Sequence, residues 1–168
     1  MSASDDLIGR YAAGGPLLCH AISGLTPEQE KARPNPGKWS FSQTVVHLLD
    51  TDLVFADRMK RVLAEHEPDL IPFDQDAWVE RLDAHSMSVE EAANLFVANR
   101  RWMTRILRHC SEADFARAGL HREAGRQTLA ALLAKVANHL DHHLGVLYAM
   151  RAKIGVAIIP HYGRDSIR

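Results

Sequence analysis

The chain has 168 residues and a formal net charge of −1, with 46% hydrophobic and 24% charged residues. This length suits one domain with its own core, so we interpret residues 1–168 as a single domain. The balanced charge gives no reason to expect nucleic acid or an anionic membrane as a partner. Cys19 and Cys110 lie far apart without Cys-x-x-Cys spacing, which predicts reduced thiols. Because the first residues lack the basic region of a signal peptide and no apolar run reaches about 18 residues, we expect a cytoplasmic protein without a membrane span.

Helical signals dominate the first half of the chain. A helix is predicted over about 4–23, with Gly14-Gly15-Pro16 expected to break or kink it. Thr26-Pro27-Glu28-Gln29 combines a capping box with proline at the first helical position, so a short helix begins there. Ser40-Phe41-Ser42-Gln43 is a second capping box, which predicts a long helix to about Glu65.

The second half continues in the same way. A short helix is predicted over 74–82, and Ser88-Val89-Glu90-Glu91 opens a third long helix. The stretch 111–126 is mixed, with two glycines as breakers, and no strand is predicted. A fourth long helix should run from about 128 to just before Gly155, and the tail 156–168 should be irregular. Four long helices with long crossings predict an all-α fold, a four-helix bundle with short additional helices in the crossings.

Two histidines mark the last long helix. Residues four apart lie one turn apart on a helix, and at about 100° per residue His139 and His143 are separated by about 40°. Both fall within an apolar stripe formed by Leu132, Val136, Val146, Leu147, Met150 and Ile154. Buried imidazoles need polar partners, and one divalent metal would satisfy both. The pair therefore predicts half of a metal site.

His47 is the third candidate ligand. It lies on the flank of the apolar stripe of the helix that begins at Ser40, and Thr44, Thr51 and Arg58 fall near it on the helical wheel. The apolar positions of that stripe are Phe41, Val45, Leu48, Phe55, Met59 and Val62. His47 with His139 and His143 would supply three nitrogens and leave one position open, as catalytic zinc sites do.

Alternatives to this site remain open. A histidine at the edge of a stripe is often a satisfied interior or surface residue, and His47 alone fits that interpretation. His142 projects about 100° away from His143 and is left out, although His139 with His142 has usable i,i+3 spacing. Leu140 follows His139, so the His-Glu-x-x-His motif of zinc peptidases is absent, and no Glu-x-x-His motif of di-iron bundles occurs. A mononuclear histidine site remains.

Several short segments together resemble the DinB/YfiT-like superfamily. The similarity runs from about 34 to 151, and the individual motifs are loose while their order and spacing are fairly specific. The matching segments are Lys38-Trp39-Ser40, His47-Leu48-Leu49-Asp50, Gly119 to Gly125, Thr128-Leu129, and His139 to Val146.

The resemblance implies a four-helix bundle with one divalent metal, often zinc or nickel, on His47, His139 and His143. The family includes S-transferases that activate a low-molecular-weight thiol such as bacillithiol, mycothiol or glutathione. Other members are known only as metal-dependent hydrolases or as damage-inducible proteins, and members often form dimers, which makes a homodimer one expected state.

Three functions follow as hypotheses. The first is metal-assisted transfer of a small thiol to an electrophile, with Arg58 as a candidate for binding an anionic group, unless it is a solvated surface arginine. The second is hydrolysis by metal-bound hydroxide, for which Asp50 is the nearest acid in sequence, in contact with the ligands or solvated. The third is a non-enzymatic helical module of stress-related function. Trp39 and Trp78 could wall a pocket, although a packing role in the core is the favoured interpretation for both.

Overall fold

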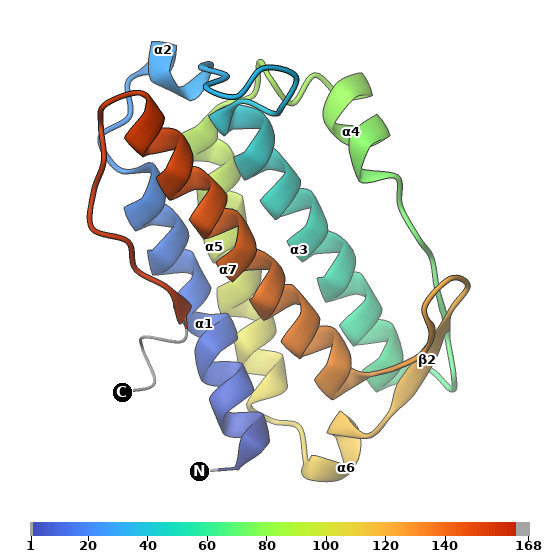
Figure 1. The fold of residues 1–168 in the computed structure, drawn as a ribbon. Coiled ribbons are helices and arrows are strands. Elements are labelled where there is room, and N and C mark those ends of the chain that lie inside the picture. Colours follow the sequence, from blue (N-terminus) through green and yellow to red (C-terminus); the bar gives the residue numbers. More distant parts are fainter. Residues whose placement is uncertain (1, 164–168) are drawn as a thin grey trace.

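The computed structural model describes residues 2–163, and it confirms the helical bundle (Figure 1). The part of the expected irregular tail from 164 to 168 lies outside the described residues. In chain order the elements are α1 (Ala3–Ile22), α2 (Pro27–Glu30), α3 (Phe41–Ala64), β1 (Asp69–Leu70), α4 (Gln75–Arg81), α5 (Val89–Leu107), α6 (Glu112–Phe115), β2 (Ala118–His121), β3 (Gly125–Thr128) and α7 (Leu129–Lys153).

The four long helices are α1, α3, α5 and α7, and each packs against two of the others. α1 and α3 both contact α5 and α7, so α1 and α3 occupy opposite corners of the bundle. In Figure 1, α1 and α7 run in one direction and α3 and α5 in the other. Because α3 and α5 run the same way, the chain must return along the bundle between them, and β1 and α4 lie in that crossing.

Side-chain caps fix where the helices begin. Ser40 accepts a hydrogen bond from the Gln43 backbone N–H, and the Gln43 side chain accepts one from the Ser40 N–H, as the sequence predicted. Ser88 caps α5 through the Glu91 N–H without a reciprocal bond. At the same end of the bundle Gly155 has φ of +77°, the left-handed conformation expected after α7.

The predicted break in α1 was wrong. The helix continues through Gly14, Gly15 and Pro16, and the glycines serve close packing instead. A Cβ on Gly14 would lie 1.9 Å from Nη1 of Arg100, and one on Gly15 would lie 3.2 Å from Val97. The absence of side chains thus lets α5 approach α1 closely. From sequence alone, glycines that serve such packing cannot be distinguished from glycines that break a helix.

The prediction that the chain holds no strand was also wrong. β2 pairs antiparallel with β3, and β1 adds a parallel edge to β2 with Asp69 opposite Leu120. This small sheet joins the two crossings at one end of the bundle (Figure 1). It holds His121 beside α3, which matters for the second cavity described below.

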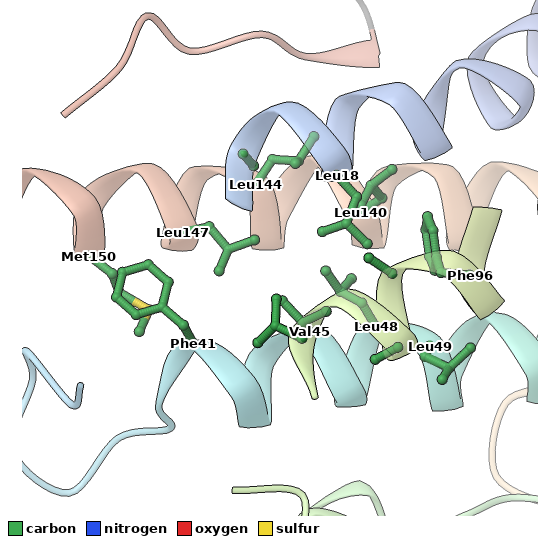
Figure 2. Packing of buried hydrophobic residues seen from close by; sticks show 14 of the residues in the cluster. Leu18, Phe41, Val45, Leu48, Leu49, Phe96, Leu140, Leu144, Leu147 and Met150 are labelled. Atoms are coloured by element: carbon green, nitrogen blue, oxygen red, sulfur yellow. The ribbon is translucent and has the colours of Figure 1, made fainter. Parts of the chain in front are cut away.

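Buried side chains from all four long helices form the core. Figure 2 shows one cluster in which α7 contributes Leu140, Leu144 and Leu147. The apolar stripe proposed for this helix omitted Leu140 and Leu144, and Val146 is only partly buried. The stripe proposed around Val45 in α3 is buried throughout, as expected. Among residues 2–163, no helix combines the length and apolar character needed to cross a membrane.

Candidate metal centre

Three histidines meet where α3 packs against α7. His47 comes from α3, while His139 and His143 come from successive turns of α7. Ring nitrogens of the three lie within 4.8 Å of one another, and His47 Nε2 is 3.0 Å from His139 Nε2. In residues 2–163 no other group of three or more His, Cys, Asp or Glu side chains gathers in this way. The structure thus brings together the three residues that the sequence proposed.

Burial keeps these histidines neutral. His47 is 1% exposed, and the loss of water lowers its pKa to about 4. The same desolvation, followed by the charge of the neighbouring imidazoles, lowers the pKa of His139 and of His143 to about 3. At neutral pH each of the three rings keeps one unprotonated nitrogen, which is the form that binds a metal.

The arrangement fits a divalent ion better than it fits ordinary packing. Nδ1 of His47 and Nδ1 of His143 are buried without a hydrogen-bond partner among residues 2–163, so packing alone leaves one polar atom of each ring unsatisfied. Zinc held by two imidazoles at about 2.0–2.1 Å in tetrahedral geometry places their nitrogens about 3.3 Å apart, close to the His47–His139 separation. Three neutral nitrogens on a shared centre therefore form a site that could hold a metal ion.

His142 lies outside this group, as the sequence indicated. It is exposed to solvent, and its ring meets that of His143 edge-on with centroids 4.9 Å apart. The i,i+3 alternative of His139 with His142 is not the pair that gathers with His47.

A cavity of about 690 Å³ opens beside His143. Lys38, Trp39 and Asp76 are among its lining residues, and the Trp39 ring packs against His47 with centroids 4.7 Å apart. Trp39 therefore walls the cavity, as one interpretation of the sequence proposed. Trp78 does not line it and packs edge-on against Phe73.

A second cavity, of about 220 Å³, touches the cluster from the side of His139. Thr51 and Arg58 from α3 line it, together with His121 from β2 and Lys135 from α7. The polar strip of α3 predicted beside the core thus continues along the helix, from Thr44 in the larger cavity to Arg58 in the smaller one. The three histidines stand between the two cavities.

The two further candidates differ in placement. Arg58 is buried, 5% exposed, so it is not the solvated surface arginine that the sequence allowed. Asp50 is half-buried with a pKa raised by desolvation, and it lines neither cavity.

Sequence reasoning missed Asp76, which lines the larger cavity and whose charge raises the pKa of His47 against the effect of burial. The position of Asp76 depends on the packing of α4 against α3, and no local sequence pattern predicts that packing.

The fold and site define a helical bundle with a buried three-histidine cluster beside a cavity. Residues 14–147 match the model of the DinB superfamily, and the chain belongs to that family. A protein of Geobacillus thermodenitrificans named "Putative metal-dependent hydrolase" is 32% identical over 138 residues, covering 80% of this chain and 76% of that protein.

Two solved structures from Bacillus subtilis share the fold. YfiT, described as a probable metal-dependent hydrolase with an unusual four-helix bundle topology, superposes with a TM-score of 0.86 at 25% identity, covering 92% of this chain and 90% of YfiT. A DinB-like protein superposes with a TM-score of 0.67 at 17% identity, covering 93% and 96% of the two chains, which shows the common fold alone.

Proposed function

We propose that this protein is a metal-dependent enzyme that transfers a low-molecular-weight thiol to an electrophilic small molecule. The observation that carries the proposal is the cluster of three neutral histidines at the wall of a cavity of about 690 Å³. His47, His139 and His143 would hold one divalent ion, zinc or nickel, with a coordination position left for a ligand. When bound, such an ion lowers the pKa of a coordinated thiol or water, so that a nucleophile exists near neutral pH.

The residues of the chain would orient the reactants. Trp39 packs against the His47 ring and walls the cavity, and it would exclude water from one side of the reacting centre. Lys38 offers a positive charge on the same wall for an anionic part of the thiol. In a transfer to a chloroalkyl electrophile the sulfur would form the new S–C bond, and chloride would leave with the bonding electron pair. This step needs no general base once the thiol is deprotonated.

Hydrolysis is the second candidate, and two observations favour it. Asp76 lines the same cavity and could take a proton from a water molecule directed at an ester or amide. Relatives at about a third identity carry names of metal-dependent hydrolases. The two functions predict different requirements, because a transferase consumes a thiol and a hydrolase does not.

Two measurements test the proposal. The first is metal content per chain by plasma mass spectrometry on untagged protein, where about one ion is expected. The second incubates the metal-loaded protein with bacillithiol, mycothiol or glutathione and monochlorobimane, and separately with a panel of esters and amides without thiol. Thiol-dependent conjugation that is lost in His143→Ala and kept in His142→Ala supports transfer. Turnover of esters or amides without thiol supports hydrolysis, and neither activity in a metal-loaded protein would overturn both.

A further inference from the structure

Arg58 differs from the other buried arginines of residues 2–163 in lacking a full set of partners. Arg100 pairs with Asp52 through Nε and Oδ1 at 2.8 Å. Arg151 donates from Nε and Nη1 to three backbone carbonyls. Arg58 is in no ion pair with the described residues, and its buried Nε has no hydrogen-bond partner. Its one bond to an oxygen runs from Nη2 to the Ile71 carbonyl at 2.6 Å. The charge of Asp57 and the Phe55 ring, 5.1 Å from Cζ, offset only part of this desolvation, so a ligand that completes the hydrogen bonds of the guanidinium would stabilise it.

His121 faces this guanidinium in an arrangement that also lacks an acceptor. The backbone N–H groups of Glu123 and Ala124 donate to its Nδ1 at 3.3 and 3.2 Å. A neutral imidazole that accepts at Nδ1 carries its proton on Nε2, and that atom lies 3.3 Å from Nη2 of Arg58. Two donor atoms therefore lie side by side in the lining of the cavity, close enough for one acceptor oxygen to bond to both. An anionic acceptor between them would receive a hydrogen bond from both.

The walls of this cavity of about 220 Å³ supply further positive charge and one more unused polar atom. Lys135 lines it from the exposed side of α7, and Glu123 is the one acidic side chain that residues 2–163 contribute to its lining. Thr51 Oγ1 is buried there and has no hydrogen-bond partner in the part of the chain that the structure describes. His139 lies in the same lining, so a molecule seated in the cavity touches the histidine cluster.

We infer that this cavity is a subsite for the carboxylate of a small-molecule substrate, held by Arg58 with His121 and Lys135. Nε–H and Nη2–H of a guanidinium form a fork that matches the two oxygens of a carboxylate. The remainder of the substrate extends past His139 toward the cluster. The choice of a substrate as occupant rests on the proposed function, whereas the binding itself does not require a metal.

The test is a chemical-shift titration of metal-free protein with succinate at constant ionic strength. Succinamide is the neutral analogue of the same shape, and inorganic phosphate is the second anion. Succinate is expected to shift the Arg58 Nε–H and the His121 ring resonances saturably, while succinamide does not. Lys135→Ala and Arg58→Lys, each checked for an unchanged fold by its amide spectrum, should weaken binding, the latter about tenfold. Lys38→Ala, in the other cavity, should leave the affinity unchanged.

Three outcomes would overturn the inference: no saturable shift with succinate, shifts that respond to Lys38→Ala and not to Lys135→Ala, or tighter binding of phosphate than of succinate. If the protein takes up one metal ion but shows no shift with succinate, the subsite is overturned and the proposed function stands. If the protein binds succinate but takes up no metal, the subsite stands and the proposed function is overturned.

Discussion

Nε2 of His47 lies 3.0 Å from Nε2 of His139, and the two residues are 92 positions apart in the sequence. A metal bound by both would therefore link α3 to α7 in the folded state only. We predict that zinc or nickel raises the melting temperature of protein stripped with EDTA. At a free metal concentration a thousand times the dissociation constant, the gain is about 4 kcal/mol, or roughly 10 °C for a chain of this size. Differential scanning calorimetry with and without metal measures it, and an unchanged melting temperature would contradict the site.

Neighbouring histidines on α7 provide a matched pair of variants. His143→Ala removes one of the three clustered rings, so it should abolish the metal-dependent rise in melting temperature. His142→Ala removes an exposed ring from outside the group and should leave the rise intact. Metal content by mass spectrometry should follow the same pattern. If the two results were exchanged, the i,i+3 pair of His139 with His142 would be the one that binds.

Acidification should destabilise the metal-free protein. The folded-state pKa values of about 4 for His47 and about 3 for His139 and His143 lie below the unfolded value of about 6.5. Between those values the unfolded chain binds more protons than the folded one, so stability falls as the pH falls. The contribution is complete above about pH 6.5 and is lost progressively toward about pH 3. Melting temperatures across that window should drop less steeply in His47→Gln than in the parent protein, and equal slopes would refute the linkage.

Local chemistry explains how much of the fold was predictable. Reciprocal caps such as that of Ser40 with Gln43 specify where helices begin, and the spacing of His139 and His143 places them on one helical face. The small sheet has no comparable local cause. β1 consists of two residues whose extended form depends on pairing with β2, where Asp69 lies opposite Leu120, far along the chain. Strands this short lack the alternation that sequence patterns detect.

The residues of the candidate site were likewise predictable where they lie on a long helix and unpredictable where they lie in the crossings. Periodicity placed His47 beside the core and Arg58 on the same strip of α3, and both proved to be buried. Periodicity could not predict which residues from other elements line the two cavities beside that strip. Asp76 reaches the larger cavity from α4, and His121 reaches the smaller one from β2. Both come from the crossings, whose positions depend on tertiary packing and not on a repeating pattern.

A buried ion pair beside the cluster provides a stability prediction. Asp52 in α3 accepts hydrogen bonds from Arg100 Nε at 2.8 Å, Asn99 Nδ2 at 2.7 Å and the Tyr11 hydroxyl at 3.2 Å. Asp52→Ala would leave the Arg100 cation buried without its counter-ion, which should cost about 3–5 kcal/mol in the free energy of unfolding. Urea denaturation measures this cost.

The control for that variant lies on the same helix. Asp57 pairs with Arg61 at 2.8 Å, but both side chains are largely exposed, so Asp57→Ala should leave stability close to that of the parent protein. Equal losses in Asp52→Ala and Asp57→Ala would mean that the buried pair contributes no more than a surface pair.

The two cysteines should differ in reactivity. Cys19 is exposed on α1, whereas Cys110 is partly buried, and desolvation followed by the charge of Asp114 raises the pKa of its thiol. Because the thiolate is the nucleophile, Cys19 should be alkylated first by iodoacetamide at pH 8. Peptide mass spectrometry over time distinguishes the two sites, and faster labelling of Cys110 would contradict the described burial.

The exposure of Cys19 also bears on the transferase assay, because an exposed thiol attacks monochlorobimane by itself. Conjugation measured in a Cys19→Ser background should therefore retain its dependence on added thiol and on His143.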